Sequence, residues 1–172
     1  MEGFFISDKR NMKQQELIFS YEEYNSEKEL GSDDAFLLRR AKDATDNAYA
    51  PYSHFHVGAA AKLANGEIIT GSNQENASFP VGICAERVLL SAASALYPNV
   101  QIVSIAITYQ SPSGESNFPV APCGICRQTL NEYENRSGHS IRLLLSGMKG
   151  KVYVIPQAGQ LLPLAFSGKQ LK

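Results

Sequence analysis

Cysteines at the starts of two predicted helices constrain the fold of this chain more than any other feature. Cys84 lies at the start of the apolar segment ICAERVLLSAASALY, and Cys123 and Cys126 belong to the motif PCGICR. A CxxC motif at a helix start holds two thiolates about one turn apart, close enough to share one zinc ion. The helix dipole also favours the thiolate form there. Cys84 supplies a third ligand if the two helix starts meet in the fold.

Three protein ligands leave the fourth tetrahedral position of zinc open, which distinguishes a catalytic from a structural site. His139 is the alternative fourth ligand, and it would close the site. It follows Gly138, which is expected to end the CxxC helix, so it lies far from that helix's first turn. Buried cysteines without metal are the other alternative, which the motif CAE and the proline before CxxC disfavour. The sequence therefore predicts a catalytic zinc ion held by Cys84, Cys123 and Cys126.

Glu86 follows Cys84 by two residues. An acidic residue in the first turn of a helix is favoured by the dipole whatever its function. However, the residues three and four positions later are Leu89 and Leu90, which offer no ion pair. We interpret Glu86 as a proton carrier for a water molecule whose pKa zinc lowers to about 7.

Arg87 and Arg127 each directly follow a cysteine of the predicted site. A cation in the first turn opposes the helix dipole. Three thiolates around Zn²⁺ leave a net negative charge, and a guanidinium that donates to sulfur restores part of the Lewis acidity. We predict this role for Arg87. For Arg127 the same role and that of an ordinary solvated arginine remain open.

Hydrophobic periodicity predicts a single α/β domain. The element order αββαβαββ implies a three-layer α/β/α sandwich around a mixed sheet of about five strands. Helices are expected over residues 35–49, from about 84 to 97 and from about 122 to 137, and strands over residues 57–64, 67–73, 100–109, 141–146 and 151–156.

Residues 1–32 are expected to form an N-terminal extension and residues 33–172 the domain, because the early segment is largely acidic and polar. ELIFSY, at residues 16–21, is the one part of the extension able to pair as a short strand. A length of 172 residues fits one domain with a proper core.

The formal net charge is −1, which gives no reason to expect nucleic acid or another polyanion as a partner. No run of about 18 apolar residues able to span a bilayer occurs. The N-terminus MEGFFISDKRNMK lacks the long apolar run of a signal peptide. Three cysteines, an odd number, argue against a disulfide framework. We expect a cytoplasmic protein that binds neither nucleic acid nor membrane.

The pattern C-x-E…P-C-x-x-C resembles that of zinc nucleobase deaminases, here with Cys84 in place of a histidine. Together with AYAPYSHFHVGAA and GSNQENASFPVGICAERV, the motif PCGICRQTL makes roughly residues 35–170 similar to the free-nucleoside cytidine deaminases of the small homotetrameric type. The resemblance implies their fold, one zinc ion per subunit, and a homo-oligomer, with a tetramer favoured and a dimer possible. It also implies hydrolysis of cytidine and 2′-deoxycytidine to the uridines and ammonia in pyrimidine salvage.

The resemblance assigns roles to residues that match the family pattern. Glu86 becomes the general acid and base. Asn73 and Glu75 would hold ribose hydroxyl groups, and Phe55 would lie against the pyrimidine. The backbone of Ala85 would contact the carbonyl or amino edge of the base. Aromatic residues complete the implied site, although each can equally be a core residue: Tyr52 and Phe79 as pocket walls, and Phe166 as the aromatic that reaches a neighbouring subunit.

The N-terminal extension and the segment QSPSGESNFPVA at residues 110–121 are longer than is usual in this family. Three other functions stay open: deamination of a modified cytosine nucleoside, deamination of nucleic acid, and non-catalytic zinc binding. The segment Asn73-Gln74-Glu75 favours an ordinary nucleoside, and the charge balance offers no basic channel for nucleic acid. A non-catalytic module would need a fourth protein ligand and would have no use for Glu86.

Overall fold

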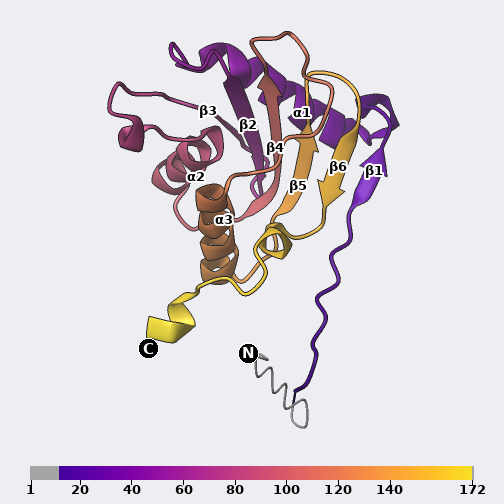
Figure 1. The fold of residues 1–172 in the computed structure, drawn as a ribbon, viewed down its shortest axis with the longest axis vertical. Helices are drawn as coiled ribbons and strands as arrows, with labels where there is room; N and C mark the ends of the chain where they lie inside the picture. Colours follow the sequence, from indigo (N-terminus) through magenta and orange to yellow (C-terminus); the bar gives the residue numbers. More distant parts are fainter. Residues whose placement is uncertain (1–11, 172) are drawn as a thin grey trace, which may run out of the picture.

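The computed structural model describes residues 12–171, with the side chains of Lys169 and Gln170 left out. A mixed sheet with the strand order β1-β6-β5-β4-β2-β3 forms the middle of the molecule (Figure 1). Only β4 and β5 pair in parallel within this sheet. The strands are β1 (Glu22–Tyr24), β2 (His56–Leu63), β3 (Ile68–Ser72), β4 (Ile102–Gln110), β5 (Arg142–Ser146) and β6 (Val152–Ile155).

Three helices cover the two faces of the sheet: α1 (Ser32–Ala44), α2 (Ala85–Leu96) and α3 (Gly124–Ser137). The helix α1 lies on one face, and α2 and α3 lie on the other (Figure 1). Successive side chains of a strand point to opposite faces of the sheet. In β4, Ala106 therefore packs with α1, whereas Ile105 and Ile107 pack with α2 and α3. The predicted three-layer α/β/α sandwich is confirmed.

The sheet has six strands rather than about five, because part of the N-terminal extension joins it. Glu22 lies opposite Val154 and Tyr24 opposite Val152, so β1 extends the sheet beyond β6. Tyr24 also packs against the core on the α1 side. The expected short strand therefore lies just after residues 16–21, which have no regular structure and are exposed.

The helices that carry the cysteines begin where the sequence indicated. Cys84 is the N-cap of α2 and Cys123 is the N-cap of α3. The start of α2 lies directly against β3, because a Cβ atom at Gly71 would come within 2.6 Å of the Leu89 nitrogen. Gly138 ends α3 with a φ of 70°, a left-handed conformation that glycine adopts without strain.

The long segment that precedes α3 rests on the turn between β5 and β6. The amide of Lys149 donates to the carbonyl of Ser116 at 3.1 Å, and Ser116 is buried. A Cβ atom at Gly147 would lie 2.0 Å from the same carbonyl. The approach of residues 116–117 to this turn therefore depends on glycine.

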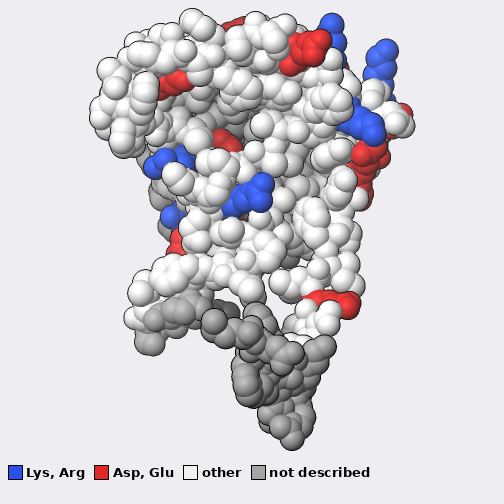
Figure 2. Space-filling view, in the orientation of Figure 1, with Lys and Arg blue, Asp and Glu red and all other residues white. Residues whose placement is uncertain are grey.

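On the face shown in Figure 2, Lys and Arg side chains are scattered and do not gather into one basic patch. No helix within residues 12–171 has the length and apolar character needed to cross a bilayer.

Candidate active site

The three cysteines converge at the N-terminal ends of α2 and α3. The sulfur atoms of Cys84 and Cys123 are 3.8 Å apart, and those of Cys123 and Cys126 are 3.6 Å apart. All three lie within 4.8 Å of one another. Zinc–sulfur bonds of about 2.3 Å in a tetrahedron separate two sulfur atoms by about 3.8 Å, so the group fits a zinc ion.

The sulfur atoms differ in how readily they ionise. A hydrogen bond from Cys126 lowers the pKa of Cys84 to about 6, despite the partial burial of Cys84. The same hydrogen bond, together with burial, raises the pKa of Cys126. Within residues 12–171, the only group of His, Cys, Asp and Glu side chains with metal-ligand spacing is this one. His139 follows the C-cap of α3, at the opposite end of the helix from Cys123.

Glu86 lies in the first turn of α2 and is only 4% exposed. Burial raises the pKa of its carboxyl group, and hydrogen bonds with its own backbone amide and with Cys126 oppose this rise. A carboxyl group with a raised pKa exchanges protons closer to neutral pH than an ordinary glutamate does. Glu86 therefore combines contact with the cysteine group and the acid–base character of a proton carrier.

A pocket of about 570 Å³ opens in front of the cysteines. Cys84, Cys123 and Glu86 form one part of its wall. The other predicted residues that line it are Phe55, Asn73, Glu75 and Phe79. Further lining residues, which the sequence interpretation did not single out, include Val57, Ile83, Ile107, Val120 and Ala121.

Three of the residues predicted to bind substrate do not line this pocket. Tyr52 packs edge-on against Phe79 with ring centroids 5.6 Å apart, so it contacts a lining residue without lining the pocket itself. Ala85 is fully buried between two lining residues. Phe166 lies on the C-terminal tail, 57% exposed and outside the pocket of its own chain.

Asn73 holds the backbone of the segment that leads into β2. Its Oδ1 accepts from the Val57 amide at 2.7 Å, and its Nδ2 donates to the Phe55 carbonyl at 2.9 Å. These two bonds were not foreseen from the sequence, because they join segments 16 and 18 residues apart. One Nδ2 hydrogen of Asn73 remains for a ligand.

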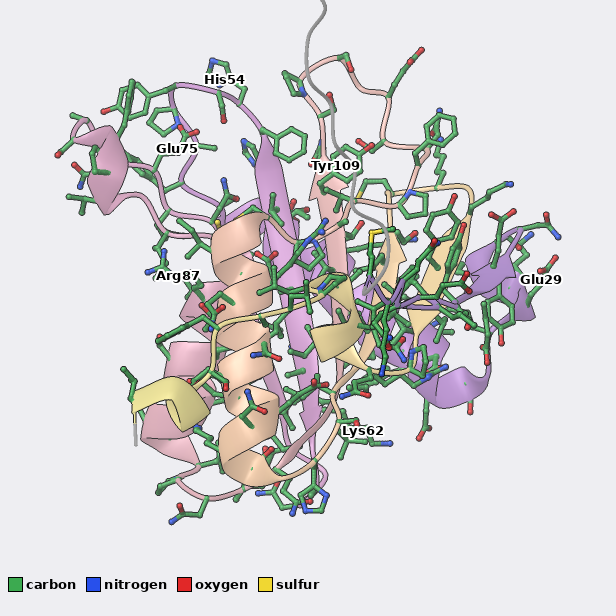
Figure 3. All side chains as sticks on the ribbon, turned by 60° about the horizontal axis from the view of Figure 1, so that its bottom comes forward. Glu29, His54, Lys62, Glu75, Arg87 and Tyr109 are labelled. Atoms are coloured by element: carbon green, nitrogen blue, oxygen red, sulfur yellow. The ribbon has the colours of Figure 1, made fainter. Side chains whose placement is uncertain are left out.

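Glu75 binds the backbone at the beginning of the segment that leads into β2. Its Oε2 accepts from the Tyr52 amide at 2.9 Å and the Ser53 amide at 3.3 Å. Hydrogen bonds from Ser53 and Tyr52 lower the pKa of Glu75, and the nearby His54 adds to this effect (Figure 3). The carboxylate is therefore ionised at neutral pH, with Oε1 left to accept another hydrogen bond.

Tyr109 is a supporting residue that the sequence interpretation missed. Its ring stacks on Phe55 with centroids 5.0 Å apart and an angle of 20° between the ring planes. Tyr109 lies near the end of β4, opposite Val57 of β2. No local signal marks this contact, because it depends on the pairing of two strands.

The two arginines differ from each other in their contacts. The half-buried Arg87 side chain makes no hydrogen bond to sulfur within the described part of the chain, but its charge helps to lower the pKa of Cys84. Arg127 donates from Nε to the Pro122 carbonyl at 2.7 Å and from Nη1 to the Leu161 carbonyl at 3.1 Å. Arg127 thus binds backbone oxygens, which is neither of the two roles left open for it.

Comparisons with known proteins agree with this site. Residues 31–137 match the family model described as the cytidine and deoxycytidylate deaminase zinc-binding region. A cytidine deaminase of Halalkalibacterium halodurans is 34% identical over 139 residues, which cover 81% of this chain and 98% of that protein. A cytidine deaminase of Sporosarcina psychrophila is 35% identical over 78% of this chain and 92% of that protein.

Solved structures are similar as well. The crystal structure of a cytidine deaminase from Burkholderia pseudomallei superimposes with a TM-score of 0.67 at 38% sequence identity, over 80% of this chain and 100% of that one. The enzyme from Mycobacterium tuberculosis gives a TM-score of 0.61 at 29% identity, over 80% of this chain and 99% of that one. This chain belongs to the cytidine and deoxycytidylate deaminase family and is a hydrolytic deaminase enzyme.

Proposed function

We propose that this enzyme hydrolyses free cytidine and 2′-deoxycytidine to uridine and 2′-deoxyuridine, with release of ammonia. The observation that carries the proposal is that a buried carboxyl group, Glu86, shares one pocket wall with two cysteines of a group that fits zinc. The pocket volume of about 570 Å³ lies in the usual range for sites that enclose small molecules.

Cys84, Cys123 and Cys126 would hold the metal through their thiolates. A bound zinc ion supplies Lewis acidity, which makes a water molecule a competent nucleophile at neutral pH. The positive charge of Arg87 acts on this group through Cys84, whose pKa it helps to lower. We assign Arg87 the role of offsetting the charge of three thiolates.

Glu86 would carry both protons of the reaction. It takes a proton from the attacking water, whose oxygen bonds to C4 of the cytosine ring, and delivers it to N3. It then carries the remaining hydroxyl proton to the amino group, so that the bond between C4 and the amino nitrogen breaks and ammonia leaves. Water and cytidine are thereby converted to uridine and ammonia with no other reactant.

The pyrimidine would lie against Phe55, whose other face is supported by Tyr109. Phe79 closes the wall, and Tyr52 packs against it. We propose that the backbone at Ala85, between Cys84 and Glu86, contacts the edge of the base.

Asn73 and Glu75 would bind the sugar. After their bonds to the segment 52–57, Asn73 has one donor hydrogen left and Glu75 has one acceptor oxygen left. One donor and one acceptor satisfy a single hydroxyl group. A single hydroxyl group can therefore engage both residues, which is compatible with activity on both ribo- and 2′-deoxyribonucleosides.

A free nucleoside is favoured over nucleic acid by the net charge of −1 and by the scattered basic residues on the face in Figure 2. We further propose a homotetramer with one zinc ion per subunit, acting in pyrimidine salvage in the cytoplasm. The position of Phe166, exposed and outside its own pocket, suits a contact with the pocket of a neighbouring subunit.

A substrate series tests this proposal. The zinc-loaded protein is incubated with cytidine, 2′-deoxycytidine, 2′,3′-dideoxycytidine and a single-stranded oligonucleotide rich in cytosine. We expect the first two to release ammonia with kcat/KM values within about tenfold, a much higher KM for the dideoxynucleoside, and no reaction with the oligonucleotide. Deamination of the oligonucleotide but not of cytidine would contradict the proposal.

A further inference from the structure

The helix α3 contacts two parts of the molecule that are distant in sequence. Its first turn carries Cys126, and the segment immediately before it carries Cys123. The next two residues bind the C-terminal tail: Arg127 through the Leu161 carbonyl at 3.1 Å, and Gln128 through the Phe166 carbonyl at 3.0 Å. The C-terminal tail passes across α3 (Figure 3).

One guanidinium group joins the tail to the cysteine-bearing turn. While Nη1 of Arg127 reaches the Leu161 carbonyl, its Nε donates to the Pro122 carbonyl at 2.7 Å. The Pro122 carbonyl belongs to the peptide bond that leads into Cys123. Holding this oxygen therefore fixes the peptide plane from which the Cys123 side chain projects.

The other side-chain contacts of the cysteine-bearing turn are those among the three sulfur atoms and the bond from the Thr129 hydroxyl to the Ile125 carbonyl at 2.9 Å. Within residues 12–171, no side-chain hydrogen bond caps the start of α3, and Cys123 is exposed. A hydrogen bond from a charged donor is about twice as strong as one between neutral groups. The bond from Arg127 to Pro122 is thus well suited to set the position of the Cys123 sulfur.

The tail gives Arg127 a firm second attachment. The buried carboxylate of Glu134 accepts from the amides of Ala158 at 3.0 Å and Gly159 at 2.9 Å, in the 3₁₀ turn Ala158–Leu161. A Cβ atom at Gly159 would lie 2.7 Å from Glu134 Oε2, so the turn fits closely against α3. Leu161 itself packs against the hydrophobic core.

We propose that Arg127 is a positioning residue that ties the Cys123 turn to the C-terminal tail, so that zinc binding and the order of residues 160–163 are linked. The inference rests on the metal site proposed above. Because a coupling between two sites is reciprocal, zinc must order the tail as strongly as the attached tail favours zinc.

The geometry separates this role from charge compensation. A lysine at position 127 keeps the positive charge, but its single nitrogen cannot occupy the positions of both Nε and Nη1. Arg127→Lys should therefore behave like Arg127→Ala if the residue acts as a tie. It should behave like the wild type if the residue only offsets the charge of the thiolates.

The test compares Arg127→Lys, Arg127→Ala and Gln128→Ala with the wild type and with Arg39→Ala, which removes an exposed arginine of α1. Zinc retention is measured by competition with a chromogenic chelator. We expect both Arg127 variants to retain zinc 10- to 100-fold less well, as is typical for partners of metal ligands. Gln128→Ala and Arg39→Ala should stay within about twofold of the wild type, because among the described residues the side-chain bond to the Pro122 carbonyl comes from Arg127, and Gln128 binds the Phe166 carbonyl instead.

Hydrogen exchange provides the second measurement. The Leu162 amide, which donates to the Gly159 carbonyl, reports on the order of the tail. Zinc should slow its exchange in the wild type but leave it unchanged in Arg127→Ala. If Arg127→Lys retained zinc as well as the wild type does, the proposal would be overturned. The same holds if the wild type binds zinc but its Leu162 amide exchanges at the same rate with and without the metal.

Failure of the metal site gives a different result. A wild-type chain that takes up no zinc contradicts the proposed metal site and with it the coupling. The contact of Arg127 with the C-terminal tail is tested without metal. Hydrogen exchange at the Leu162 amide should be faster in metal-free Arg127→Ala than in the metal-free wild type. Equal exchange rates in those two proteins would overturn the tie.

Discussion

The sulfur atoms of Cys84 and Cys123 lie 3.8 Å apart, although 39 positions separate the two residues in the chain. Each residue is the N-cap of a different helix, and both helices lie on the same face of the sheet (Figure 1). The metal site therefore depends on the packing of the fold as a whole, and its ligands should act together.

Replacement of Cys84 by alanine should abolish stoichiometric zinc binding. Removal of one of three thiolates leaves only the Cys123–Cys126 pair, which does not complete a closed or catalytic zinc site. Metal analysis after dialysis measures this directly. Ser91→Ala, an exposed position on the same helix, is the matched control and should keep its zinc. Full zinc occupancy in Cys84→Ala would remove Cys84 from the ligand set.

Replacement of Asn73 by alanine should weaken both the fold and substrate binding. The two bonds from Asn73 to the backbone of Val57 and Phe55 contribute about 0.5–1.5 kcal/mol each to stability. We expect a loss of about 1–3 kcal/mol in the free energy of unfolding, measured in urea, and a higher KM for cytidine.

Asn73→Asp sharpens this test. The aspartate keeps an acceptor for the Val57 amide but places an oxygen opposite the Phe55 carbonyl, so it should be at least as damaging as alanine. The control is Asn135→Ala, an exposed asparagine on α3. If Asn73→Ala raised KM without any loss of stability, the residue would serve the ligand alone.

Much of this site was predictable because its signals are local. Cysteine, acid and proline at helix starts have a direct physical meaning, so Cys84, Glu86 and Cys123 could be selected before the fold was known. The signal for the helix end at Gly138 is equally local, and the structure confirms it.

Contacts across the fold could not be predicted in the same way. The stacking of Tyr109 on Phe55 depends on the register of β2 and β4, which no short sequence window reveals. For Arg127, which follows Cys126, a contact with sulfur and a solvated side chain were both open, but its bonds run to Pro122 and Leu161. Its neighbours in space, rather than those in sequence, determine its role.

Glu86 should make the metal-free protein less stable at neutral pH than the isosteric Glu86→Gln variant. Burial raises the pKa of Glu86 in the folded state above the ordinary value of about 4.3. Below that pH, Glu86 is protonated in both the folded and the unfolded state, and its burial does not lower the stability of the folded state. As the pH rises towards the folded pKa, only the unfolded state loses its proton, so the folded state loses relative stability.

Urea unfolding with a chelator present, at several pH values from 4 to 8, checks this prediction. The stability advantage of Glu86→Gln should be absent near pH 4 and grow as the pH rises. A Glu86→Gln protein that is less stable than the wild type at pH 7 would show that burial does not disfavour the charged form.

Loss of β1 should destabilise the domain. A chain that begins at residue 31 lacks the half-buried Tyr24 and Leu30, which pack against the core on the α1 side, whereas a chain that begins at residue 22 keeps them. Each side chain contributes up to about 1.5–3 kcal/mol when fully buried. We expect the shorter chain to be less stable than the longer one by about 2–4 kcal/mol in thermal or urea unfolding. Equal stability of the two chains would show that residues 22–30 do not stabilise the domain.

The most direct test of the account is ammonia release from cytidine by the wild type and by Glu86→Gln, each expressed per mole of bound zinc. We predict that both proteins bind equal amounts of zinc and that only the wild type forms ammonia and uridine in equal amounts. The variant should be slower by at least about 10²-fold, the lower end of what a general acid–base group contributes. A Glu86→Gln protein with a near-wild-type rate, or a zinc-loaded wild type that releases no ammonia, would contradict it.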